Sequence, residues 1–206
     1  MNSMLQKLFS NNDPEKEAGF LVQMVCESAF TVFRDGQFRK LIDFEKRDQE
    51  DQNRIFNELE VTGLILLLFL IDDSVQFVNI KRKKFWSEVR DMVSETFLNW
   101  MGSMGIEDQF LDIWKNLIDE RENEYKERIE ILREHLKKNV FNSSELAKKP
   151  IKETVKRKFI RLECFSFGCA EHMPWKKPIK DQKALQQHLK SWILVLDIKL
   201  AKRILY

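Results

Sequence analysis

Apolar side chains recur every three or four residues along most of the chain, which is the spacing of one face of an α-helix. The longest such run lies between Ile106 and Lys138, and it is interrupted only at Arg121. Its members are Phe110, Trp114, Ile118, Arg121, Tyr125, Ile129, Leu132 and Leu136. The other faces of this segment are dense in Glu, Lys and Arg. We therefore expect a long, partly solvated helix, which could pair with a second copy of the chain.

The most apolar segment is apolar on every side. Residues Val61–Ile71 form a stretch of eleven residues without a charge, within a helix expected from about Gln52 to Asp73. A helix of this kind is stable only when neighbouring helices surround it, so we place it at the centre of the fold. It is too short to cross a bilayer, which takes about 20 apolar residues, so no transmembrane segment is expected.

Further helical patterns cover residues 14–33, 37–46, 81–100, 151–165 and 181–206. Pro14 suits a first helical turn, and Gly168 is expected to follow the end of the fourth of these helices. Only six Gly and four Pro occur in 206 residues, so turns are few. The pattern predicts an all-α fold, a single bundle-like domain of about six or seven helices.

Charge is sorted along the chain, although the formal net charge is only +2. Residues 1–146 contain 20 Lys and Arg against 28 Asp and Glu, whereas residues 147–206 contain 15 against 5. We interpret 1–146 as an acidic helical core region and 147–206 as a basic C-terminal helical subregion. The last helix carries apolar side chains such as Trp192 and Leu196 on one face. The basic subregion should therefore pack on the core within one domain.

The basic residues are densest just after the change of sign. The set comprises Lys148, Lys149, Lys152, Lys156, Arg157, Lys158 and Arg161. Such a cluster can neutralise nucleic-acid phosphates, or attract an acidic protein or an anionic lipid surface. Val155 and Phe159 give the same helix an apolar stripe, which suits such a surface. The alternative is a basic face that packs near the acidic helices of the same molecule or stays solvated.

A metal site is a further hypothesis. Cys164, Cys169 and His172 lie within nine residues, and thiolates with an imidazole are ligands that suit zinc. The pattern lacks a fourth ligand at the usual spacing, so Cys26 or His188 would have to complete the site. In the alternative interpretation both cysteines are small buried groups and His172 is a loop residue.

Other acidic side chains have simpler interpretations. Glu124, Glu127 and Glu130 alternate with basic residues, which is typical of a solvated helix face with pairs such as Glu124–Arg128. Asp72 and Asp73 lie at the unfavourable C-terminal end of the apolar helix. We expect a nearby cation there, and the cluster at residues 81–84 is a candidate.

Motifs for catalysis are missing from the sequence. It contains no Glu-x-x-His, no His-Asp pair and no glycine-rich phosphate loop. No cofactor is expected. Three cysteines in 206 residues do not suggest a disulfide framework, and the first residues lack an apolar leader, so we expect a cytoplasmic protein.

The function predicted is therefore a non-enzymatic interaction protein that could self-associate through residues 106–138. The alternatives are a nucleic-acid-binding or regulatory protein that uses residues 148–161, and a metal-binding protein that uses Cys164, Cys169 and His172.

Overall fold

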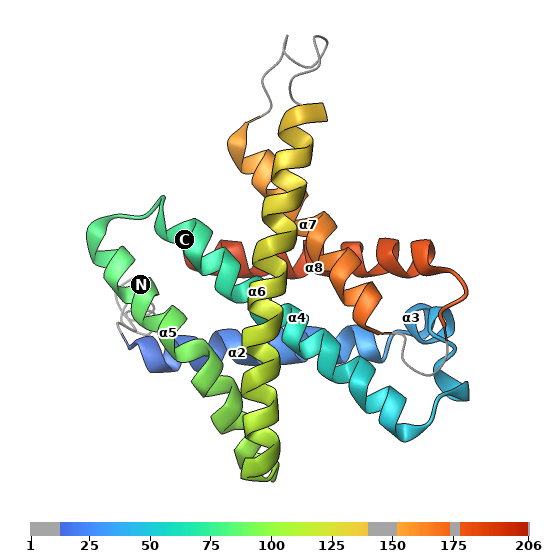
Figure 1. Ribbon diagram of the computed structural model, residues 1–206. Coiled ribbons are helices and arrows are strands. Elements are labelled where there is room, and N and C mark those ends of the chain that lie inside the picture. Colours follow the sequence, from blue (N-terminus) through green and yellow to red (C-terminus); the bar gives the residue numbers. More distant parts are fainter. Residues whose placement is uncertain (1–12, 140–151, 174–177, 206) are drawn as a thin grey trace, which may run out of the picture.

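The computed structural model describes residues 13–139, 152–173 and 178–205. Across these residues the chain forms α-helices, one short 3-10 helix and no strand, which confirms the predicted all-α multi-helix fold (Figure 1). The elements are α2 (Pro14–Phe33), α3 (Gly36–Leu41), η1 (Phe44–Lys46), α4 (Gln49–Val75), α5 (Ile80–Ser103), α6 (Asp108–Asn139), α7 (Glu153–His172) and α8 (Gln182–Leu205). None of the described helices is both long enough and apolar enough to span a membrane.

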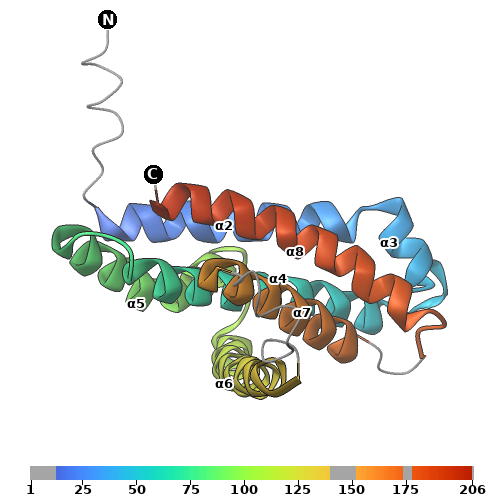
Figure 2. The same ribbon diagram turned by 90° about the horizontal axis from the view of Figure 1, so that it is seen from above.

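The helices are arranged in three layers. In Figure 2, α2 and α8 lie side by side in one layer, and α5, α4 and α7 form a second layer beneath them. Helix α6 crosses the outer face of the second layer, where it contacts α4, α5 and α7 (Figures 1 and 2). Helices α7 and α8, from the basic part of the chain, pack against each other and against α4.

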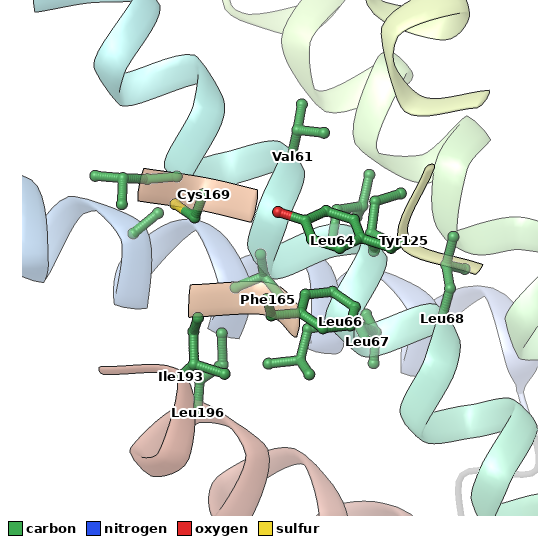
Figure 3. Packing of buried hydrophobic residues seen from close by; sticks show 14 of the residues in the cluster. Val61, Leu64, Leu66, Leu67, Leu68, Tyr125, Phe165, Cys169, Ile193 and Leu196 are labelled. Atoms are coloured by element: carbon green, nitrogen blue, oxygen red, sulfur yellow. The ribbon is translucent and has the colours of Figure 1, made fainter. Parts of the chain in front are cut away.

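Helix α4 is the centre of the molecule, as its sequence predicts. It contacts α2, α5, α6, α7 and α8. Every residue from Glu58 to Leu68 is buried, so this part of α4 meets protein on all sides. Figure 3 shows its leucines packed with Phe165 of α7 and with Ile193 and Leu196 of α8. The burial includes two carboxylates, Glu58 and Glu60, which lie just before the apolar stretch.

Five of the described helices begin at a side chain that caps their first turn. In each case an Asp or Asn carboxyl or amide oxygen accepts a hydrogen bond from the backbone N–H three residues later, which satisfies a donor that the helix leaves free. The pairs are Asp13 with Lys16, Asp35 with Phe38, Asp48 with Asp51, Asn79 with Arg82, and Asp181 with Ala184. These caps fix where the helices begin, and Pro14 occupies the first turn as predicted.

Helix α7 is longer than its sequence suggests. The prediction that it ends near Phe165 is wrong, because the helix continues through Gly168 to His172. Gly168 marks a close helix crossing instead: a Cβ atom at this position would lie 2.6 Å from Cε1 of Tyr125 on α6. The Tyr125 ring also stacks on Phe165, with ring centroids 4.2 Å apart. Glycine is therefore required here for packing and does not end the helix.

The segment 37–46 also differs from its prediction as one helix. It forms α3 and η1, separated at Asp43, whose φ of 50° is left-handed. A residue in that conformation cannot continue an α-helix, so the chain turns at this point.

Candidate ligand-binding pocket

A cavity of about 670 Å³ lies between α2, α4 and α5. Helix α2 contributes one face, with residues spaced by three, one, three, one and three: Gly19, Val22, Gln23, Cys26, Glu27 and Phe30. Phe56 and Glu60 lie one helical turn apart on α4. The remaining wall consists of Thr96, Trp100 and Met104, which are spaced by four. The volume is within the range of about 300–1,000 Å³ that is usual for sites of small organic ligands.

Two features of the lining keep this space open, a glycine and an aromatic pair. Gly19 lines the cavity without a side chain, and a Cβ atom placed there would have no heavy atom within 4 Å. The neighbouring rings of Phe30 and Phe56 meet edge to face, with centroids 6.2 Å apart, and are thereby held at the wall. The cavity is thus bounded by packed aromatic side chains.

The carboxyl group of Glu60 is the one deeply buried polar feature among the described lining residues. Glu60 is only 2% exposed, and its Oε1 atom has no hydrogen-bond partner. Burial raises the pKa of Glu60 from its ordinary 4.5 to about 8. Near neutral pH this group is mostly protonated, so it can donate a hydrogen bond to a ligand or release its proton to a base.

Stability should depend on pH because of Glu60. The folded chain holds this proton up to about pH 8, whereas the unfolded chain releases it near the ordinary carboxyl pKa of 4.5. The free energy of unfolding therefore falls as pH rises through this interval, by about 1.4 kcal/mol for each unit of the difference in pKa. We expect Glu60→Gln to unfold at a higher urea concentration than the wild type at pH 8.5, and at a similar one at pH 5. Parallel pH profiles for the two proteins would contradict this assignment.

Cys26 of α2 lines the same cavity and lies close enough to Glu60 of α4 for the two groups to interact electrostatically. Burial raises the pKa of its thiol far above the ordinary value, and the nearby carboxyl group adds to the effect. The thiol stays protonated near neutral pH, so it lacks the thiolate that a nucleophile requires. In the described lining, Cys26 therefore acts as a small apolar side chain.

A buried polar cluster joins α4 and α6. Arg121 donates to both carboxylate oxygens of Glu58 at 3.2–3.3 Å, and Thr62 bridges Glu58 and the Tyr125 hydroxyl. Burial raises the pKa of Glu58, against the attraction of Arg121. This ion pair explains why Arg121 interrupts the apolar face of α6. Every one of these groups has a partner, so the cluster ties helices together.

The three side chains proposed as metal ligands are buried or contact other residues. Cys169 is fully buried near Tyr125 (Figure 3), and burial raises the pKa of its thiol. Cys164 is also buried, with a thiol pKa raised to about 11. His172 is in the last turn of α7, and its Nε2 atom lies 2.8 Å from Glu124 Oε1. Within the described part of the chain, no three His, Cys, Asp or Glu side chains are grouped to hold a metal ion.

The proposed basic surface is largely used within the molecule. Arg161, proposed from the sequence as a contact for an external partner, is 8% exposed and pairs with Asp197 and Asp73 of the same chain. Lys158 lies 3.5 Å from Asp197, and Arg157 lies 3.7 Å from Asp73. The pairs with Asp73 correspond to the alternative in which the basic face packs near the acidic helices, whereas Asp197 belongs to the basic subregion itself.

The other members of the basic set are placed differently. Lys152 is exposed, Lys156 lies 3.8 Å from Glu153, and Lys148 and Lys149 lie outside the described residues. Val155 and Phe159 are exposed, so the apolar stripe of α7 remains at the surface. Binding of nucleic acid or of an acidic partner through this helix stays a prediction, now without Arg161.

The acidic residues also find partners that the sequence does not reveal. Asp72 pairs with Arg90 at 3.2 Å and Asp73 with Arg161, so the cations at the end of α4 come from α5 and α7 and are not those of residues 81–84. Glu124 pairs with Arg128 as predicted, at 2.7 Å. It is only partly exposed, because it also faces Arg121 and His172.

On α6, Ile113 and Ile131 are the most exposed large apolar side chains. They share one face, because their spacing is about five full helical turns. Self-association through residues 106–138 stays a prediction, and a second copy would find its apolar contacts at these two positions.

Comparison with known proteins identified no relative of this chain. No protein-family model matches the chain, and searches of curated proteins and of solved structures found no significant match.

Proposed function

We propose that this protein is a non-enzymatic binding protein that takes a small, largely apolar ligand into the pocket between α2, α4 and α5. The observation that supports the proposal is the Glu60 carboxyl group, buried beside a cavity of about 670 Å³ with an oxygen that has no partner. Burying an unpaired polar group costs about 1–3 kcal/mol, and a ligand that supplies the missing hydrogen bond removes that cost.

The lining favours binding over catalysis. It is dominated by apolar and aromatic groups with few polar ones, which is the usual composition of a small-molecule site. Its thiol is protonated near neutral pH, and no described lining residue is a histidine that could serve as its base. We therefore propose that the binding partner of this predicted non-enzymatic interaction protein is a small molecule.

We also propose that the protein is located in the cytoplasm. Cys26, Cys164 and Cys169 are all buried and free, which is the state that a reducing compartment maintains.

Filling the pocket should prevent binding. Leucine at position 19 has open space in front of it, so Gly19→Leu should fold normally and project its side chain into the cavity. We expect the neutral apolar fluorophore N-phenyl-1-naphthylamine to bind the wild type, and its affinity to fall by about tenfold or more in the variant, as for a loss of at least 1.4 kcal/mol. Fluorescence titration measures the affinity, and circular dichroism spectra of the wild type and the variant show whether the variant is folded.

Gly36→Leu is the matched control. Gly36 also has open space at its Cβ position, but it lies at the start of α3 and does not line the pocket. Its titration curve should equal that of the wild type. Unchanged binding by a folded Gly19→Leu variant would overturn the proposed function.

A further inference from the structure

We infer that the ligand of this pocket is an apolar cation, an amine or ammonium compound whose charge pairs with Glu60 while its hydrocarbon part lies against the aromatic wall. This inference rests on the proposed function and adds the chemical class of the ligand.

The charges of the lining all have one sign. Glu27 and Glu60 are the only charged residues among the eleven that line the cavity, and none is Lys, Arg or His. Glu27 is exposed and accepts a hydrogen bond from Gln23 at 2.7 Å, so it places a negative charge at the mouth. Glu60 is at the buried end, on α4. An anion would be repelled by Glu27 at the mouth and could not pair with Glu60, whereas a cation is attracted by Glu27 and pairs with Glu60 once that carboxyl group ionises.

The aromatic residues suit a cation as well. The rings of Phe30, Phe56 and Trp100 line the cavity, and cations bind favourably over the faces of such rings. The wall therefore combines surface for a hydrocarbon chain with groups that tolerate positive charge near it.

Binding of a cation exchanges one proton. In the free protein Glu60 holds its proton near neutral pH, because a buried carboxylate without a partner is unfavourable. An ammonium group that enters supplies the opposite charge, so the carboxylate forms and the proton passes to solvent.

Few other groups titrate nearby. The titratable groups that face Glu60 are Cys26 and Glu27 of α2, and the α5 wall contributes only Thr96 and Trp100, which do not titrate. Cys26 stays protonated near neutral pH, since burial raises its pKa further. Glu27 is exposed at the mouth. The proton released between about pH 6 and 8 is therefore that of Glu60.

Three probes of equal chain length separate the possibilities. Octylamine, 1-octanol and octanoate should be titrated calorimetrically into the full chain at pH 7. We expect octylamine to bind about tenfold or more tightly than octanol, and octanoate to bind most weakly. The octylamine enthalpy should vary with the ionisation enthalpy of the buffer, as for release of nearly one proton. Octylamine affinity should fall by about tenfold for each pH unit below the pKa of Glu60.

Variants identify the group responsible. In Glu60→Gln, which keeps the shape of the side chain, octylamine affinity should fall to near that of octanol and lose its pH dependence. Glu27→Gln should weaken octylamine binding by a smaller factor, because the mouth is exposed to solvent.

The outcomes distinguish this inference from the proposed function. If octanol equals octylamine in the wild type, or if Glu60→Gln keeps the preference for octylamine, the cation assignment is wrong. The binding function still stands in that case, provided that Gly19→Leu loses octanol. If none of the three probes binds, or if Gly19→Leu binds them as the wild type does, both the function and the inference are overturned.

Discussion

Replacing Arg161 by methionine is expected to lower the free energy of unfolding by about 3–5 kcal/mol, the usual cost of removing one partner from a buried ion pair. The Arg161 guanidinium donates to Asp197 at 2.8 and 3.0 Å, and it also donates to Asp73. Asp197 is almost fully buried, and without the guanidinium, Lys158 at 3.5 Å is the one cation that remains beside it among the described residues. Urea denaturation followed by circular dichroism near neutral pH measures the change.

Arg54→Met is the control with the same chemistry at the surface. Arg54 lies 3.1 Å from Glu50, and both side chains are exposed, so its loss should change the stability by no more than about 1 kcal/mol. A change of that small size at Arg161 would show that its internal pairs contribute little. Arg161 would then again be available as a cation for an external partner.

Alanine at Gly168 and at Gly19, two of the helical glycines, is expected to have opposite effects. At Gly168 the new methyl group would lie 2.6 Å from Tyr125, and overpacking of this kind costs about 1–3 kcal/mol. At Gly19 it has no heavy atom within 4 Å, so the higher helix propensity of alanine should stabilise the protein by about 0.5–1 kcal/mol. The same urea denaturation measures both variants.

Tyr125→Leu tests the cause of the Gly168 effect. The smaller side chain removes the ring that meets the new methyl group, so Gly168→Ala should cost less in this background than in the wild type. A double-mutant cycle gives the difference as an interaction energy. Equal costs in both backgrounds, or a stabilised Gly168→Ala variant, would contradict the role assigned to this crossing.

The sequence predicts the helices well because helical periodicity is a local property. The face of α6 from Phe110 to Leu136 follows from spacing alone, and so does the position of Val61–Ile71 at the centre. The ends of the helices are harder to predict from the sequence. Gly168 looks like the end of a helix in the sequence, and only the neighbouring Tyr125, 43 positions earlier in the chain, shows that it belongs to a helix crossing.

Partners across the molecule account for the remaining differences. Arg121 interrupts an apolar face, and its partner Glu58 is 63 residues away, so the pair depends on how α6 crosses α4. The sorting of charge along the chain indicates an internal acidic–basic contact, but it does not select Asp73 and Asp197 as the partners of Arg161.

The pocket was not predicted, although one signal for it is present. Glu58 and Glu60 come directly before a stretch that is apolar on all sides. A carboxylate buried in such a place is normally paired with a cation, so an unpaired one indicates a special site. Glu58 is paired, whereas Glu60 has a buried oxygen without a partner. The cavity itself depends on the packing of three helices and on the missing side chain of Gly19, which no spacing rule reveals.

The position of α4 links the pocket to the whole molecule. Because α4 contacts every other long helix that the structure describes, a ligand against Glu60 touches the element that those helices share. A ligand bound only by the folded state lowers the population of opened forms by a factor of one plus the ratio of the free ligand concentration to Kd. Amide hydrogens in α6, α7 and α8, which contribute no described residue to the pocket, should then exchange more slowly when the pocket is filled.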